Sequence, residues 1–97
     1  MPKGYWIALY HSVEDPAALT DYAAAAGPVL LSFGARFLAR GMPSHTYEGG
    51  AHQRCVLIEF ESVDRAAAAY ASPAYQAALA KLKSAVRREV RIVPGVD

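Results

Sequence analysis

Hydrophobic residues recur at two spacings along this 97-residue chain, and these spacings predict strands and helices. The segment from Tyr5 to Val13 (YWIALYHSV) is aromatic and aliphatic with almost no charge, which predicts a first strand. Its two alternating sets are both largely apolar: Tyr5, Ile7, Leu9 and His11 on one side, and Trp6, Ala8, Tyr10 and Ser12 on the other. A strand with one face exposed to solvent alternates apolar and polar residues. We therefore expect both faces of this strand to be covered.

A helix is predicted directly after this strand. Asp15 is a suitable N-cap, and Pro16 fits the first helical position, where a missing N–H does no harm. Gly27-Pro28 is expected to kink or restart the helix near its end, and Gly34 to end it in a left-handed cap. The residues that share its apolar face are Leu19, Tyr22, Ala23, Ala26, Leu30 and Phe33.

Two short strands are predicted at residues 35–41 and 53–62, separated by a loop rich in Gly, Pro and polar residues that we expect to be mobile. Ser62 can cap a second helix. That helix breaks at Ser72-Pro73, where a new cap followed by proline predicts a restart with no catalytic part. The stripe after the break comprises Tyr75, Ala78, Leu79, Leu82 and Val86. A fourth strand from residue 87 is ended by Pro94-Gly95.

The order of these elements is strand, helix, strand, strand, helix pair, strand. It predicts a single α+β domain over residues 1–97 with the ferredoxin-like βαββαβ arrangement, a four-stranded antiparallel sheet with helices on one face. Helices on one face leave the other face open, although the first strand is apolar on both. The simplest solution is a homodimer in which two open sheet faces pack together by a twofold contact.

Composition supports a further buried surface and excludes several classes of partner. The chain is 54% hydrophobic and only 20% charged, more apolar than a small monomer needs. Its net charge of +1 gives no field that favours nucleic acid or anionic lipid. No apolar run reaches the roughly 20 residues of a membrane span, and the start lacks a signal-peptide pattern. We expect a cytoplasmic protein with neither nucleic-acid nor membrane partner.

An ordered set of short motifs resembles a known family. GYWIA, DP with a following Tyr22, FGARFLARG, EG, RxVLIEFxS, AxxYxSxxY and a closing VPGVD occur in this order over nearly the whole chain. Together they are similar to the domain of unknown function family 1330, small bacterial proteins related to the dimeric α/β barrels. The one departure is Ala35, where a second glycine is expected, and this is a minor steric change.

The resemblance implies fold and assembly more than activity. The wider superfamily includes cofactor-independent monooxygenases, haem-degrading enzymes, muconolactone isomerases and stress-responsive barrel proteins, and a shared fold does not carry function across. Two functions stay open. One is a cofactor-independent enzyme acting on a small hydrophobic acid or carbonyl compound. The other is a non-catalytic module for ligand binding or assembly.

Charged residues on the inner strands are the first candidates for a site. Arg36, Arg40 and Arg54 lie on or beside these strands, and Glu59 interrupts the apolar run VLIEF. A buried unpaired carboxylate is very costly, so Glu59 needs a cation or donors. In the functional interpretation Arg40 clamps an acidic or carbonyl oxygen beneath the helices, and Glu59 holds that arginine or acts as base. The alternative is a structural ion pair, or a Glu59 side chain that reaches solvent.

Aromatic residues and a histidine extend this candidate set. Tyr22 would donate to the ligand from the first helix, with Arg36 and Phe37 also binding it. His11 is a less certain acid or base, because a strand-end histidine is more often a hydrogen-bonded edge residue. The tyrosines at 5, 10, 22, 70 and 75 either line a pocket or pack in the core or interface. The expected apolar walls are Phe33, Phe37, Leu79 and Leu82. All these placements depend on strand register, since a one-residue slip reverses each side chain.

The loop MPSHTYEGGAH at residues 42–52 could close over the mouth of this site as a lid. Its His45, Glu48 and His52 have ligand-type atoms, but not at the spacing of a recognised metal motif, so we expect no metal. No phosphate-binding glycine loop or cofactor lysine stands out, and no cofactor is expected. Cys55 is the only cysteine, which excludes an internal disulfide, and we expect it to behave as a small buried hydrophobe.

Overall fold

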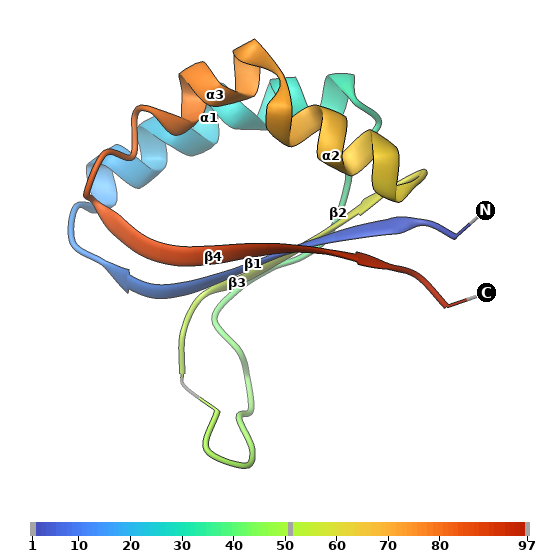
Figure 1. The fold of residues 1–97 in the computed structure, drawn as a ribbon. Helices are drawn as coiled ribbons and strands as arrows, with labels where there is room; N and C mark the ends of the chain where they lie inside the picture. Colours follow the sequence, from blue (N-terminus) through green and yellow to red (C-terminus); the bar gives the residue numbers. More distant parts are fainter. Residues whose placement is uncertain (1, 51, 97) are drawn as a thin grey trace.

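The computed structural model describes residues 2–50 and 52–96, and it has one sheet with three helices packed on one side (Figure 1). The elements are β1 (Gly4–Val13), α1 (Pro16–Ser32), β2 (Arg36–Gly41), β3 (Cys55–Phe60), α2 (Val63–Ala71), α3 (Pro73–Leu79) and β4 (Val86–Pro94). The predicted order of elements is confirmed. No helix of the described residues is long and apolar enough to cross a membrane.

The four strands form an antiparallel sheet in the order β2-β3-β1-β4. This is the order that the split βαβ arrangement requires, because β3 inserts between β1 and β2, and β4 lies on the other side of β1. The α+β ferredoxin-like fold is therefore confirmed. Since β4 and β2 are the edge strands, the rims of the space beneath the helices lie along these two strands.

Alternation along β1 separates the two faces of the sheet. Trp6, Ala8 and Tyr10 are buried beneath the helices, together with Ile58 and Phe60 of β3. The other set of β1 is only half-buried or exposed, so the chain itself covers a single face of this strand. At the start of β1, Gly4 lets the strand approach α2 closely: a Cβ there would lie 2.6 Å from the Ser62 carbonyl oxygen.

The helix α1 begins as its sequence predicts but is not interrupted where expected. The Asp15 carboxylate accepts hydrogen bonds from the backbone N–H groups of Ala17 and Ala18. The helix continues through Gly27-Pro28 to Ser32, so the predicted restart there is wrong. Gly34 has a positive φ of 86°, which confirms the left-handed residue expected after the helix.

The break at Ser72-Pro73 is a helix end followed by a new start, as predicted. Ser72 Oγ accepts from the Tyr75 backbone N–H and donates to the Ala69 carbonyl, so one side chain serves both ends. The predicted stripe is too long, because α3 ends at Leu79. Leu82 lies in the following turn and Val86 begins β4, after a residue, Lys83, with φ of 51°.

The loop after β2 does not have the predicted position. In Figure 1 its described residues, from Met42 to Gly50, extend from the sheet on the side opposite the helices. Here the loop does not cover the space between the helices and the sheet, so the expected lid is not present in this arrangement. Within the loop, the rings of His45 and Tyr47 stack 6.2 Å apart.

Candidate functional site

One arginine on the covered face of the sheet is surrounded by tyrosines. Arg88 lies on β4 directly opposite Tyr10 of β1, and both point toward the helices. Tyr22 reaches down from the buried face of α1, and Tyr75 from α3. Tyr75 lies in the first turn of α3, directly after the break at Ser72-Pro73, and is buried against Trp6 of the sheet. We call these four residues the Arg88 cluster.

Hydrogen bonds join all four side chains of the Arg88 cluster. Arg88 Nη1 donates to the Tyr10 hydroxyl at 3.2 Å, and Nη2 donates to the hydroxyls of Tyr75 at 3.0 Å and Tyr22 at 3.4 Å. The Tyr22 and Tyr75 hydroxyl oxygens are 2.7 Å apart. The guanidinium carbon also lies 4.9 Å from the centroid of the Tyr22 ring, a cation–π distance. These contacts fix the guanidinium in one orientation.

Several N–H and O–H donors of the Arg88 cluster have no acceptor among the described residues. A guanidinium has N–H groups on three nitrogens, and the bonds to tyrosine leave Nε–H and one Nη1–H free. The Tyr10 hydroxyl only accepts, so its own O–H has no acceptor among the described residues. In the Tyr22–Tyr75 pair one hydroxyl donates to the other, so the O–H of the accepting tyrosine also has none. Among the described residues Arg88 has no carboxylate partner. Such a group is suited to hold an oxygen that carries negative charge.

The protonation of this cluster follows from its surroundings. Burial alone lowers the pKa of Arg88, but attraction to the three tyrosine oxygens outweighs this and leaves the pKa above its ordinary value. Burial raises the pKa of Tyr75 far above its ordinary value. At neutral pH Arg88 is therefore a cation and Tyr75 a neutral hydroxyl, which is unsuited to act as a base.

A cavity of about 70 Å³ lies beside the cluster, beneath α1. Tyr10, Tyr22 and Arg88 form one wall, and Arg40 and Arg54 also line it. Its other walls are mainly apolar: Trp6, Ala8, Leu30, Phe37, Val56 and Ile58. This lining, mostly apolar with a few polar groups, is of the kind found in small-molecule sites, although the cavity is smaller than their usual ~300–1,000 Å³.

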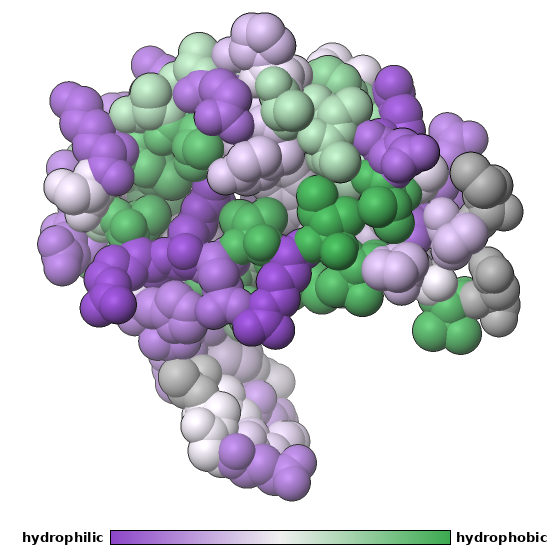
Figure 2. Space-filling model, in the orientation of Figure 1, coloured by the Kyte–Doolittle hydropathy of each residue, from purple (hydrophilic) through white to green (hydrophobic). Residues whose placement is uncertain are grey.

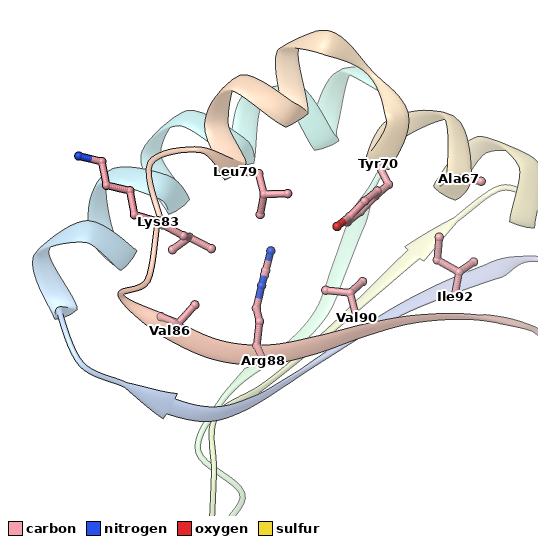
Figure 3. Close-up of a pocket in the computed structure, with 9 residues that line it drawn as sticks. Ala67, Tyr70, Leu79, Lys83, Val86, Arg88, Val90 and Ile92 are labelled. Carbon is pink, nitrogen blue, oxygen red and sulfur yellow. The ribbon is translucent and has the colours of Figure 1, made fainter.

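A larger groove of about 530 Å³ runs along the other side of Arg88, between β4 and the helices α2 and α3. Figure 2 shows hydrophobic residues gathered on this face, and Figure 3 shows Arg88 rising from β4 between Leu79 and Tyr70. The groove is more open to solvent than the cavity. Tyr10 and Tyr22 line the cavity and not the groove, whereas Arg88 lines both.

The residues predicted to form one site divide between the two faces of the sheet. Tyr22, Phe37 and Arg40 line the cavity together, as expected. Arg36 and Glu59 lie opposite each other on the uncovered face, where Glu59 accepts a hydrogen bond of 3.2 Å from the Tyr5 hydroxyl. This bond and partial burial raise the pKa of Tyr5. Glu59 therefore cannot hold Arg40 or act as a base beneath the helices.

His11 also lies on the uncovered face, away from the cavity. Its Nε2 is 2.9 Å from Glu89 Oε2, and Arg91 pairs with the same carboxylate. The pKa of Glu89 is lowered by the hydrogen bonds from His11 and Arg91. The position of His11 agrees with the interpretation as a hydrogen-bonded residue at the end of a strand, and not with a role as acid or base in the cavity.

Other predicted residues also differ in position. Of the expected apolar walls, only Phe37 lines the cavity, whereas Leu79 and Leu82 line the groove. Phe33 packs against the core under the Arg65 guanidinium. Cys55 is half-buried on the uncovered face rather than fully buried. The described residues contain no group of three side chains arranged to bind a metal.

Arg88 was not among the predicted site residues, although the residues around it in β4 indicate its position. Alternation along β4 places Val86, Arg88, Val90 and Ile92 on one face. Three of these four residues are aliphatic, so the arginine interrupts an otherwise apolar set. A single cation in the buried set of an edge strand indicates a side chain that needs a partner beneath the helices.

Solved structures share this fold. A protein of unknown function from Rhodopseudomonas palustris has a TM-score of 0.72 at 15% identity, covering 99% of this chain and 84% of its own. A dimeric protein of unknown function with a ferredoxin-like fold from Bacteroides fragilis has a TM-score of 0.62 at 14% identity, with 95% of each chain covered. SnoaB, a cofactor-independent oxygenase from Streptomyces nogalater, has a TM-score of 0.64 at 11% identity, covering 100% of this chain and 96% of its own. At these identities the likeness shows the fold alone.

Sequence comparison gives the family. No curated protein matches the chain significantly. The family model described as Domain of unknown function (DUF1330) matches residues 3–96, nearly the whole chain. The resemblance in the ordered motifs is thereby confirmed, and the chain belongs to this family.

Proposed function

We propose that this protein binds a small hydrophobic acid or carbonyl compound in the cavity beneath α1, with an oxygen of that compound on the Arg88 cluster. The observation that carries the proposal is the partly buried Arg88, which among the described residues is surrounded by tyrosine hydroxyls instead of a carboxylate. A charged ligand oxygen would accept the donors left free there. Charge-assisted hydrogen bonds of this kind are about twice as strong as neutral ones.

The cluster also suits cofactor-independent chemistry on a carbonyl compound. When a proton leaves the carbon next to a carbonyl, negative charge moves to the oxygen, and fixed donors such as Arg88 and the tyrosine hydroxyls stabilise that charge. Removing one such donor typically slows a reaction by about 10²–10³-fold. One structural neighbour is a cofactor-independent oxygenase, which is consistent with this class of chemistry.

The alternative is ligand binding without catalysis. It is favoured by one observation: no Asp, Glu or His of the described residues lines the cavity. A proton abstracted from the ligand would need an acceptor, and the candidate bases Glu59 and His11 lie on the other face of the sheet. A reaction in this cavity would then depend on the ligand itself, or on water, to accept the proton.

Acetoacetate is a suitable probe because it is both an acid and a carbonyl compound. We expect it to bind the wild type and to shift the NMR signals of the Arg88 side chain, and we expect Arg88→Gln to weaken binding at least tenfold. Lys83→Gln is the matched control, because Lys83 lines the open groove and not the cavity. Equal binding by the wild type and Arg88→Gln would contradict the proposal.

Exchange of the acetoacetate α-hydrogens with deuterated water separates the two functions. An enzyme that stabilises the enolate should accelerate this exchange, and Arg88→Gln should slow it by at least tenfold, in line with the loss of an oxyanion donor. Binding without acceleration would favour the non-catalytic module.

We also propose that the protein is a homodimer formed through the uncovered faces of two sheets. Apolar residues of the uncovered face, including Ile7, Leu9 and Leu57, are only half-buried within one chain. A structural neighbour is described as dimeric. Obligate interfaces bury about 2,000 Å² or more. Light scattering should give the mass of a dimer at micromolar concentration, and Ile7→Glu should give a folded monomer. A monodisperse wild-type monomer would contradict this proposal.

A further inference from the structure

Two more arginines line the cavity, on the β3 side of Tyr10. Arg54 precedes β3, and its backbone carbonyl accepts the Tyr10 N–H at 3.0 Å. Arg40 lies on β2 and pairs with Val56, which also faces the helices. The cavity is therefore bounded by arginines from three strands. We call Arg40 and Arg54 the second arginine pair.

The second arginine pair resembles Arg88 in having no acidic partner. The ion pairs formed by the described residues all involve Glu89, on the other face of the sheet. No Asp or Glu in the described part of the chain lines the cavity. The net charge of the chain is only +1, so this accumulation of positive charge is local. Three cations around one small cavity repel each other unless an anion lies between them.

Arg40 is also held in place over the cavity. Its guanidinium carbon lies 5.0 Å from the centroid of the Phe37 ring, and both side chains line the cavity. An arginine stacked on an aromatic ring keeps its planar donors available to a carboxylate. The exposed Arg40 and the half-buried Arg54 thus offer a second group of donors at the solvent side of the cavity.

We infer that the ligand of this cavity is a short dicarboxylate, with one carboxylate on the Arg88 cluster and the other on the second arginine pair. This inference rests on the proposed function and names its ligand class. Arg88 and Arg54 lie two strands apart, so their Cα atoms are roughly 10 Å from each other. Two anionic groups joined by a short carbon chain fit two separated groups of donors better than a single phosphate does. The apolar walls between them suit that carbon chain.

Succinate and butyrate test the inference, because they have equal carbon number and differ by one carboxylate. Binding is measured by NMR titration of the arginine side-chain signals, with inorganic phosphate as a third probe. We expect succinate to bind the wild type at least tenfold more tightly than butyrate and than phosphate. In Arg40→Gln/Arg54→Gln the preference should fall to about twofold, the statistical advantage of two equivalent carboxylates.

Arg36→Gln is the matched control, since Arg36 lies on the same strand as Arg40 but on the uncovered face. It should keep the preference for succinate. If succinate and butyrate bind equally to the wild type and both depend on Arg88, the dicarboxylate inference is wrong and the proposed acid site stands. Tighter binding of phosphate than of succinate would also overturn the inference. If neither acid binds, both proposals fail. Circular dichroism and thermal melts of each variant confirm that it is folded.

Discussion

The two faces of the sheet differ in how their charged residues are paired. On the uncovered face both signs occur and lie together: Glu89 binds His11 and Arg91, and Glu59 lies opposite Arg36. On the covered face the charged residues at the cavity are all arginines. Opposite charges that pair within the chain need no further counter-ion. Several cations around one cavity need an anion from outside the chain. The comparison supports the proposal that a ligand binds on the covered face.

The largest difference expected between the faces is in stability. Trp6 is 1% exposed and packs on Phe60 and Tyr75, so Trp6→Ala should lower the free energy of unfolding by about 3–5 kcal/mol. Its neighbour Tyr5 lies on the uncovered face, and Tyr5→Phe removes only the bond to Glu59, which should cost at most about 1 kcal/mol. Urea denaturation measures both. Equal losses would mean that the uncovered face is as much a core as the covered one.

The helix break tests how the covered face is built. Ser72→Ala removes the cap of α3, and should cost about 1 kcal/mol, as a lost N-cap usually does. Because Tyr75 is also held by packing against Trp6 and Tyr70, we expect acetoacetate binding to change less than twofold. Ser72→Thr, which keeps the hydroxyl, is the control for thermal denaturation. Loss of binding at unchanged stability would show that the break has a direct part in the site.

Arg88 distinguishes a ligand site from a structural cross-link. A methionine of similar length would lose the hydrogen bonds to three tyrosine hydroxyls but would avoid the desolvation of a cation, and these two effects oppose each other. We expect Arg88→Met to change the free energy of unfolding by less than about 1 kcal/mol in either direction, and to weaken acetoacetate binding at least tenfold. A loss of about 3 kcal/mol or more would mean that Arg88 serves the fold instead.

The sequence predicts the covered face well and its charges poorly, for a physical reason. Caps and proline positions act locally, and they predicted the helix starts at Asp15 and Ser72. The faces of Arg36 and Arg40 depend instead on a bulge between Phe37 and Ala39, which places Phe37 and Arg40 on the same side although they are three residues apart. Simple alternation puts Arg36 and Arg40 together, and nothing in RFLARG marks the bulge.

Glu59 illustrates the opposite situation. Alternation in CVLIEF places Val56, Ile58 and Phe60 on one side, so once that side is known to be buried, Glu59 must lie on the other. The alternation separates Glu59 from the aliphatic set, but only the pairing with β1 decides which of the two sets is buried. Arg88 follows the same logic, because its aliphatic companions Val86 and Val90 place it on the covered face.

The smallest expected effect is a pH dependence that belongs to the uncovered face. The hydrogen bonds from His11 and Arg91 lower the pKa of Glu89 in the folded protein, so folding favours its ionised form. This contribution to stability is complete above the ordinary carboxyl pKa and is lost as the pH falls below it. The thermal midpoint of the wild type should therefore fall more between pH 7 and acid pH than that of Glu89→Gln. Glu61→Gln is the control, because Glu61 is an exposed carboxylate outside this group and should leave the wild-type dependence unchanged. An equal pH dependence in the wild type and Glu89→Gln would mean that the charges of the uncovered face do not stabilise it through this group.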